Sequence, residues 1–365
     1  MMHAFVGWGE QSEPQRHSIR PNPPGIRHMF FRTRFDRAAS RHISAPSVLR
    51  MLVSVVAILP CAGAVAQMAQ PNAAVAPSGV IQKARIQVGG RERTYVVHRP
   101  AKLAAHPALL LVFHGSGGSG ESVREKTGRE FDALADSKGF VVVYPDGYEH
   151  SWNNCRKADT QPARQAHIDD VAFARGLIAR YRTDAGIDPK KVYAVGFSNG
   201  AQFAYRLAIE AGDEVHAVAA ISAGVPAPEN FDCKAPRHAV SMLIMNGTAD
   251  PLNPYNGGKS GMGDENNGTV MSSSVSAEYF VRLADIRATP VDSEIQAAQR
   301  PGGLSVSRAL WREQGKPSVA LYTVHGGGHA IPRPTQAGSP GMGAVDTDFD
   351  SPQEIWRFFE MAAGD

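Results

Sequence analysis

The sequence predicts a single α/β domain that extends from about residue 81 to residue 365. Three observations predict it. Short apolar runs alternate with helix-like segments through this region, as expected for strands that are connected by helices. A Gly-x-Ser-x-Gly motif lies between one apolar run and a helical pattern. Two apolar runs near the C-terminus are spaced like a closing pair of strands.

The strands follow in order from their apolar runs. Residues 84–88 and 94–98 flank Gly89-Gly90, which predicts a hairpin at an edge of the sheet. The other strands are expected at 109–113, 140–144, 192–195, 217–221, 242–245, 306–311 and 319–324.

Helices are expected where apolar residues recur at helical spacing: 121–137, about 171–181, about 201–208, 277–283 and 355–361. Asp169 or Asp170 is expected to cap the second of these helices, and Gly186 to end it. The stretch 257–274 is rich in Gly, Asn and Ser, which predicts a mobile loop. Its Gly258-Lys259-Ser260 is not a phosphate-binding loop, because position 253 is Asn where that motif needs Gly.

Residues 1–66 are expected to be a leader that is removed on export. Arg41 and Arg50 precede the apolar stretch 51–59, and Ala64-Val65-Ala66 forms a small-residue cleavage pattern. These features predict a signal peptide and a secreted or periplasmic protein, with Met29 or Met51 as alternative start positions. The apolar stretch is too short to span a membrane. Residues 67–80 then form a short N-terminal segment ahead of the α/β domain at 81–365.

The positive charge of the chain lies in that leader. The whole chain has a net charge of +3, whereas after residue 66 acidic residues outnumber basic residues by two. The mature part therefore lacks the basic excess that nucleic-acid binding requires. We expect neither a nucleic-acid nor a membrane partner, and the oligomeric state stays open.

Cys155 and Cys233 are the cysteines that remain after removal of the leader. An even pair in an exported chain predicts one disulfide, with two buried free thiols as the alternative. The sequence has no Cys-x-x-Cys motif, so it gives no support for a zinc or redox site. We expect no metal and no organic cofactor.

The stretch Gly196-Phe197-Ser198-Asn199-Gly200 is the most informative motif of the chain. A strand that turns sharply into a helix through a central Ser is the nucleophile elbow of the α/β-hydrolases. The turn exposes the Ser hydroxyl and directs the first amides of the helix toward a developing oxyanion. Ser198 is therefore the predicted nucleophile, and the amide of Asn199 is the first predicted oxyanion donor.

A nucleophilic Ser needs a His to accept its proton and a carboxylate to orient that His. In α/β-hydrolases the chain order is Ser, acid, His. Asp250 follows the strand at 242–245, and His329 lies in the Gly-rich loop after the strand at 319–324, which makes them the candidates. His325 is the rival base. Asp169 and Asp170 are rival acids, but they precede Ser198 and resemble helix caps.

The second oxyanion donor is expected from a loop after an earlier strand. The strand at 109–113 leads into His114-Gly115-Ser116-Gly117-Gly118, whose glycines let the backbone approach a ligand. Ser116 is the predicted donor, and a flexible surface turn is the alternative. His114 is expected to orient this loop rather than to act as the base.

Several motifs now resemble a known family. In order along the chain they are Phe113-His114-Gly115-Ser116-Gly117-Gly118, Ser151-Trp152-Asn153, Asp169-Asp170-Val171, the elbow at 196–200, Gly247-Thr248-Ala249-Asp250-Pro251 and Gly326-Gly327-Gly328-His329. Together they resemble the secreted poly(3-hydroxybutyrate) depolymerase and feruloyl esterase group of α/β-hydrolases, over nearly all of the chain after about residue 85. The resemblance implies a mostly parallel sheet of eight or nine strands with helices on both faces, and cleavage of carboxylic esters. It places the family's catalytic Ser, Asp and His on Ser198, Asp250 and His329.

Two positions depart from the family pattern. Ile331 lies two residues after His329, where the family often has Trp, and Ala284-Asp285-Ile286 occupies a position where it often has Cys. An aromatic wall of the acyl pocket is therefore in doubt. Trp152, Tyr255 and Ile331 are the candidate substrate-binding residues, and for Trp152 a place in the core is an equal alternative.

The sequence thus predicts an exported serine esterase that forms an acyl-enzyme with hydroxybutyrate oligomers, feruloyl esters or other short acyl esters. Amide or peptide hydrolysis by the same three residues is the alternative. A third hypothesis is a polymer-binding protein on an inactive hydrolase scaffold. The presence of Ser198, Asp250 and His329 in the expected order argues against it. No adsorption domain or Thr- or Pro-rich linker is expected after the last helix, so soluble or oligomeric esters are expected in preference to crystalline polyester.

Overall fold

A computed structural model describes residues 79–236, 238–262, 267–299, 303–334 and 338–364 of the chain. The chain divides into two units, Met1–Met68 and Ala69–Asp365. All described residues belong to the second unit, so the predicted leader and signal peptide lie outside them.

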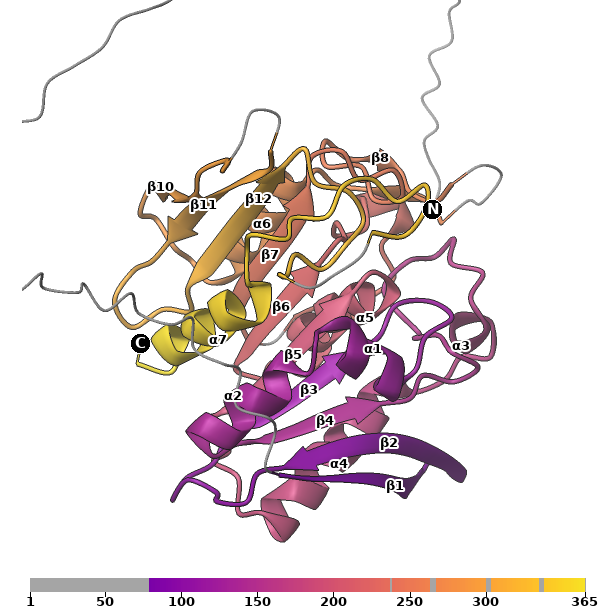
Figure 1. Ribbon diagram of the computed structural model, residues 1–365. Coiled ribbons are helices and arrows are strands. Elements are labelled where there is room, and N and C mark those ends of the chain that lie inside the picture. The colour runs from indigo at the N-terminus through magenta and orange to yellow at the C-terminus, as the bar shows by residue number, and fades with distance from the viewer. Residues whose placement is uncertain (1–78, 237, 263–266, 300–302, 335–337, 365) are drawn as a thin grey trace, which may run out of the picture. The chain divides into compact units, whose positions relative to one another are not determined.

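The second unit is built on a ten-stranded sheet with the order β1-β2-β4-β3-β5-β6-β7-β12-β11-β10 (Figure 1). Its strands are β1 Val80–Val88, β2 Arg91–Arg99, β3 Leu109–Phe113, β4 Val141–Pro145, β5 Val192–Phe197, β6 Ala217–Ile221, β7 Ser241–Gly247, β10 Val291–Gln296, β11 Ser305–Trp311 and β12 Val319–His325. The six central strands, from β4 to β12 in this order, are parallel to their neighbours, and both outer pairs are antiparallel. The carboxyl ends of the central strands therefore meet at one edge of the sheet.

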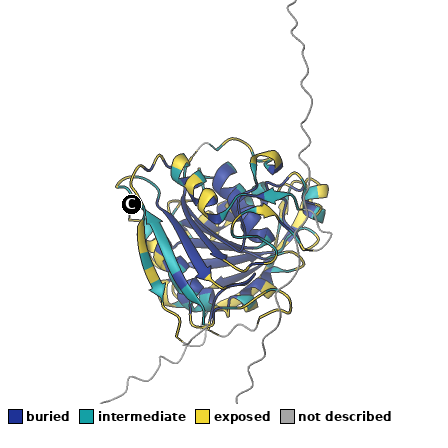
Figure 2. Cartoon of the chain, turned by 90° about the horizontal axis from the view of Figure 1, so that it is seen from above, coloured by how far each residue is buried: buried dark blue, intermediate teal, exposed yellow. Residues whose placement is uncertain are grey.

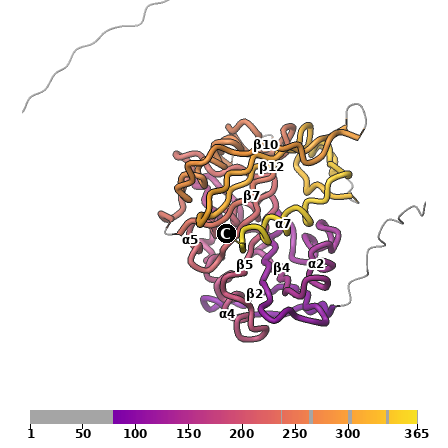
Figure 3. Tube along the Cα trace, turned by 90° about the vertical axis from the view of Figure 1, so that its left-hand side faces the viewer, coloured from indigo at the N-terminus to yellow at the C-terminus, as the bar shows by residue number. Residues whose placement is uncertain are grey.

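Helices cover both faces of this sheet, as predicted. They are α1 Gly120–Lys126, α2 Glu130–Lys138, α3 Pro162–Gln165, α4 Asp170–Asp184, α5 Asn199–Glu210, α6 Ser273–Leu283 and α7 Ser351–Ala362, with a 3₁₀ turn at Pro228–Asn230. One apolar cluster joins α4, α5 and α6 to the sheet, and a second cluster joins α1, α2 and α7 to its other face. Figure 3 shows α5 and α2 on opposite sides of the strands. Side chains alternate along β3, where Leu109 and Leu111 enter the first cluster and Leu110 enters the second.

Burial follows this layered arrangement. The central strands β3 to β7 are buried along their whole length, as their unbroken apolar runs predicted. Exposed residues lie on the outer helix faces and on the edge strands (Figure 2). The predicted hairpin around Gly89-Gly90 is confirmed, since β1 pairs with β2 and forms one edge of the sheet.

Two predicted features of the fold differ in the structure. The single helix at 121–137 is two helices, because Gly128 and Arg129 adopt positive φ angles of 69° and 58° between α1 and α2. The sheet has ten strands rather than eight or nine, since β10 adds an edge strand. Within 257–274 a short hairpin pairs β8 Gly258–Lys259 with β9 Thr269–Val270.

The predicted disulfide is present. Cys155, after β4, is bonded to Cys233, after β6, with a Cα–Cα distance of 4.9 Å. It links the loop after β4 to the loop after β6, both on the carboxyl side of the sheet. The two cysteines are 78 positions apart in the sequence.

Candidate active site

The strand β5 passes into helix α5 through a tight turn at Ser198. Ser198 has φ 55° and ψ −119°, a backbone conformation that L-residues rarely adopt. The flanking glycines make the turn possible. A Cβ on Gly196 would lie 2.1 Å from the carbonyl oxygen of Gly200, and one on Gly200 would lie 2.4 Å from that of Phe113. The glycine pattern is therefore a steric requirement, and it presents the Ser198 hydroxyl at the carboxyl edge of the sheet.

The structure brings the three predicted residues together. Ser198 Oγ lies 2.9 Å from His329 Nε2, and His329 Nδ1 lies 2.8 Å from Asp250 Oδ2. The side chains of His329 and Asp250 are 6% and 0% exposed. These residues come from three loops that follow β5, β7 and β12, and hydrogen bonds hold the loops in place. The Ala249 amide donates to the Gly327 carbonyl at 2.9 Å, and the His329 amide donates to the Met342 carbonyl at 2.7 Å.

The second carboxylate oxygen of Asp250 fixes the orientation of this group. Asp250 Oδ1 accepts hydrogen bonds from the backbone amides of Leu252 and Asn253 at 2.8 and 2.9 Å. Oδ2 is thereby left to accept from His329 Nδ1. With its proton on Nδ1, the imidazole presents an unprotonated Nε2 to the Ser198 hydroxyl.

The rival residues have other roles. His325 is exposed, and its Nε2 lies 2.8 Å from Ser307 Oγ. Asp169 caps α4 by accepting from the Ala172 amide. Asp170 is buried, pairs with Arg93 at 2.8 Å and accepts from the Asn153 amide. Burial raises the pKa of Asp170, while Arg93 opposes that rise.

Ser116 and Asn199 line the same cleft as Ser198. In the described part of the chain, neither backbone amide donates to a protein acceptor. The loop that carries Ser116 is held by His114, whose Nδ1 lies 2.7 Å from the Gly115 carbonyl and whose Nε2 accepts from the Gly147 amide at 2.9 Å. Burial lowers the pKa of His114, in keeping with a neutral ring in this position. His114 thus has the structural role that the sequence suggested.

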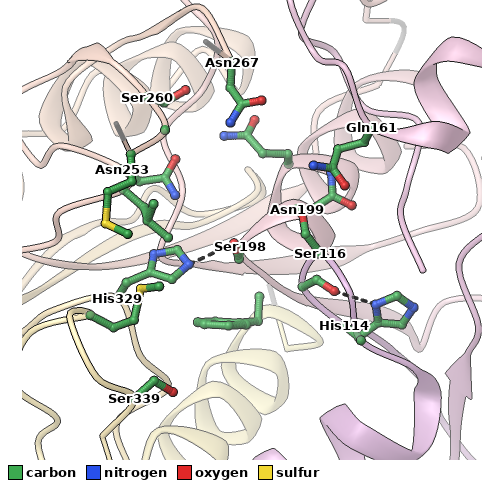
Figure 4. Close-up of a pocket in the computed structure, with 18 of the residues that line it drawn as sticks. His114, Ser116, Gln161, Ser198, Asn199, Asn253, Ser260, Asn267, His329 and Ser339 are labelled. Atoms are coloured by element: carbon green, nitrogen blue, oxygen red, sulfur yellow. Dashed lines mark hydrogen bonds between the residues drawn. The ribbon is translucent and has the colours of Figure 1, made fainter. Parts of the chain in front are cut away.

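The cleft around Ser198 has a volume of about 420 Å³, which is within the range of small-ligand sites. In the view of Figure 4, Ser198 lies between His329 and Ser116. Asn253, Ser260, Asn267 and Gln161 lie above these three residues. Amide and hydroxyl side chains form much of the lining, and Phe197, Leu252, Met262 and Met342 supply apolar surface. The sequence analysis missed most of these lining residues, because they lie on loops without a regular pattern.

The three candidate substrate-binding residues do not line this cleft. Trp152 is fully buried, stacks on Phe203 at a centroid distance of 5.3 Å and donates its Nε1–H to the His114 carbonyl at 2.9 Å. Ile331 is 1% exposed and belongs to the core on the α7 side of the sheet. The hydroxyl of Tyr255 is bonded to Thr323 Oγ1 at 2.7 Å. Ile331 therefore forms no part of the described wall of this cleft.

Neither a metal site nor a membrane span is found in the described part of the chain. No group of three or more His, Cys, Asp or Glu residues there is arranged to hold a metal ion. None of the helices described is long and apolar enough to cross a membrane.

The sheet order, the elbow and the loop positions of Asp250 and His329 define the chain as an α/β-hydrolase. A family model described as the dienelactone hydrolase family matches residues 94–260. The solved structure of acetyl xylan esterase from Aspergillus awamori aligns with a TM-score of 0.53 at 14% identity, covering 77% of this chain and 99% of that chain. This likeness agrees with the fold.

Curated relatives narrow the assignment. NocK of Nocardia uniformis subsp. tsuyamanensis, a protein named as an esterase, is 34% identical over 275 residues, which cover 72% of this chain and 77% of NocK. Feruloyl esterase D of Neurospora crassa is 25% identical, with 76% of this chain and 85% of that protein covered. Poly(3-hydroxyalkanoate) depolymerase C of Paucimonas lemoignei is 26% identical, with 72% and 65% covered. The chain belongs to this α/β-hydrolase family of esterases and depolymerases, as its motifs predicted, and the names of these relatives give no support to the amide-hydrolase alternative.

Proposed function

We propose that this protein hydrolyses short acyl or oligomeric carboxylic esters through an acyl-enzyme on Ser198. The observation that carries the proposal is the hydrogen-bonded series Ser198–His329–Asp250 beside a cleft that Ser116 and Asn199 also line, whose amides have no protein acceptor among the described residues. Hydroxybutyrate oligomers and feruloyl esters are the candidate substrates, because relatives named as a feruloyl esterase and as a poly(3-hydroxyalkanoate) depolymerase are 25% and 26% identical to this chain over most of its length.

In the first half of the reaction, Ser198 Oγ attacks the ester carbonyl carbon while His329 Nε2 accepts the hydroxyl proton. Asp250 stabilises the imidazolium that forms. The Ser116 and Asn199 amides donate to the oxyanion, and each such donor is worth roughly 10²- to 10³-fold in rate. His329 then returns the proton to the departing alcohol, which leaves the acyl group on Ser198.

In the second half, a water molecule attacks the acyl carbon and gives its proton to His329. Collapse of the second tetrahedral intermediate releases the carboxylic acid and restores the Ser198 hydroxyl. Every proton in this sequence moves through His329 Nε2, so its orientation by Asp250 is essential to both halves.

We also propose that the protein is exported. The Cys155–Cys233 bond supports this, because disulfides persist in oxidising compartments. The predicted signal peptide, ahead of residue 67, agrees with that location.

The test is a hydrolysis panel with p-nitrophenyl butyrate, methyl ferulate and hydroxybutyrate oligomers. Ser198→Ala should lower kcat by about 10⁶-fold, as loss of a triad nucleophile does elsewhere. Ser137→Ala, at a hydroxyl on α2 whose partner is the Leu134 carbonyl, is the matched control and should leave the rate unchanged. A phosphonate ester probe should add its mass to the wild type but not to the Ser198→Ala variant. A variant that keeps a few per cent of the wild-type rate, with contamination excluded, contradicts the proposal.

A further inference from the structure

The described lining of the cleft has an uneven charge. The ionisable side chains in its lining are His114, Lys126, Arg156 and His329, and no carboxylate belongs to the lining among the described residues. A surface of this kind favours an anionic ligand if at least one of the cations is available.

Two of these side chains are already committed. His114 is fixed as a neutral ring by the bonds of both its nitrogens. Arg156 is 5% exposed, pairs with Asp159 at 2.8 Å and is bonded to Asn154 through its Nε. The charge of Arg156 is therefore balanced within the protein.

Lys126 is different. It is the last residue of α1, it is half-buried, and no described carboxylate forms an ion pair with it. The neighbouring Glu125 is paired with Arg129 instead. Burial lowers the pKa of Lys126, and no described carboxylate opposes that shift.

The position of the ammonium relates it to the reacting groups. Lys126 Nζ lies over the Phe197 ring, 4.6 Å from its centroid, in a cation–π contact that leaves its N–H groups able to donate to a ligand. The His329 ring lies against the same side chain, with a centroid distance of 5.1 Å. Lys126 and Ser198 line the same cleft, so one ligand can reach both the ammonium and the Ser198 hydroxyl.

We propose that Lys126 is a specificity-determining residue that binds a carboxylate of the substrate. This inference rests on the proposed function and narrows its substrate class to esters with a free carboxylate near the scissile bond, such as the acid end of a hydroxyalkanoate oligomer. A carboxylate on Lys126 would form a charge-assisted hydrogen bond and would offset the lost hydration of the ammonium.

The experiment compares the 3-hydroxybutyrate trimer as the free acid with its methyl ester, with release of products followed by chromatography. For the wild type, kcat/KM should be at least about tenfold higher for the acid, mostly through a lower KM, since hydrogen bonds to charged groups are worth about that factor or more. Added salt should raise the KM of the acid and not that of the methyl ester.

Three variants separate charge from structure. Lys126→Met should remove the preference for the acid, and Lys126→Arg should retain most of it. Lys190→Met, which changes an exposed lysine outside the cleft, is the matched control and should behave like the wild type. Competitive inhibition of p-nitrophenyl butyrate hydrolysis by 3-hydroxybutyrate should weaken about tenfold in Lys126→Met. This measurement uses a neutral substrate and does not depend on oligomer turnover.

A wild type that cleaves both trimers equally well, or a Lys126→Met variant with an unchanged acid preference, overturns the inference and leaves the proposed esterase function in place. A wild type that hydrolyses neither trimer nor any neutral ester overturns the proposed function, and the inference with it.

Discussion

Asp250→Asn is the most informative single change, because the structure dictates how the new amide must orient. The backbone amides of Leu252 and Asn253 both donate to Asp250 Oδ1. An Asn side chain keeps these two bonds only if its oxygen occupies the Oδ1 position. Its NH₂ group then faces His329 Nδ1, which lies 2.8 Å from the present carboxylate.

That orientation selects the wrong tautomer of His329. An NH₂ group donates and cannot accept, so the imidazole must present an unprotonated Nδ1 and carry its proton on Nε2. A protonated Nε2 cannot accept the proton of Ser198. Turning the Asn amide over would restore an acceptor for His329 but would give up both backbone bonds, at about 1 kcal/mol each. We therefore expect kcat to fall by about 10⁴-fold, as in other triads with this change, which corresponds to about 5.4 kcal/mol of transition-state stabilisation.

The assay is kcat for p-nitrophenyl butyrate, with thermal unfolding to verify the fold of the variant. Asp188→Asn is a matched control, since Asp188 Oδ1 also accepts from an amide two residues on, that of Lys190, but lies outside the cleft. The control should retain the wild-type rate. A folded Asp250→Asn variant that keeps more than about a tenth of the wild-type kcat would refute the tautomer argument.

Two further predictions concern stability. Burial and the neighbouring Asp350 raise the pKa of Glu130 from 4.5 to about 8. The folded state therefore gains stability from the protonated carboxyl. This contribution is complete below pH 4.5 and is lost as the pH rises through about 8. Glu130→Gln keeps an uncharged side chain, and it should raise the melting temperature at pH 9 but not at pH 4; equal shifts at both values would contradict this. The Cys155–Cys233 bond closes a segment of 78 positions, and a Cys155→Ser/Cys233→Ser variant should lose about 4 kcal/mol of unfolding free energy in a urea titration. A loss below about 1 kcal/mol would show that the bond contributes little.

The sequence was most predictive where steric necessity limits the choice of residue. The elbow needs glycine at 196 and 200 because a Cβ would collide with backbone carbonyls, and this constraint appears directly as a motif. Asp250 and His329 could be predicted from chain order because each follows a parallel strand whose carboxyl end meets the same edge. These two residues lie 79 positions apart, so their contact depends on the sheet order and not on local pattern.

Prediction was weaker where a position depends on tertiary contacts. The break between α1 and α2 leaves the apolar spacing of residues 121–137 intact, so periodicity alone predicts one continuous helix for this segment. The edge strand β10 has no buried residue and no apolar run. Lys126 lacks a sequence signal of its own, since its neighbours are distant in the sequence: its ammonium lies over the Phe197 ring, and its carbonyl accepts from Arg333, 207 positions away.

Trp152 shows why a motif can identify an important residue and still mislead about its role. A large aromatic near the site is chemically suited to both a pocket wall and a core, and sequence does not distinguish the two. In the structure its ring lies behind the loop that carries Ser116, and its Nε1–H holds the His114 carbonyl. Its backbone amide also donates to Asn199 Oδ1 at 2.8 Å. Trp152 thus connects the loop that carries Ser116 to the start of α5, the two segments whose amides are the proposed oxyanion donors, and its place in the core follows from these two bonds.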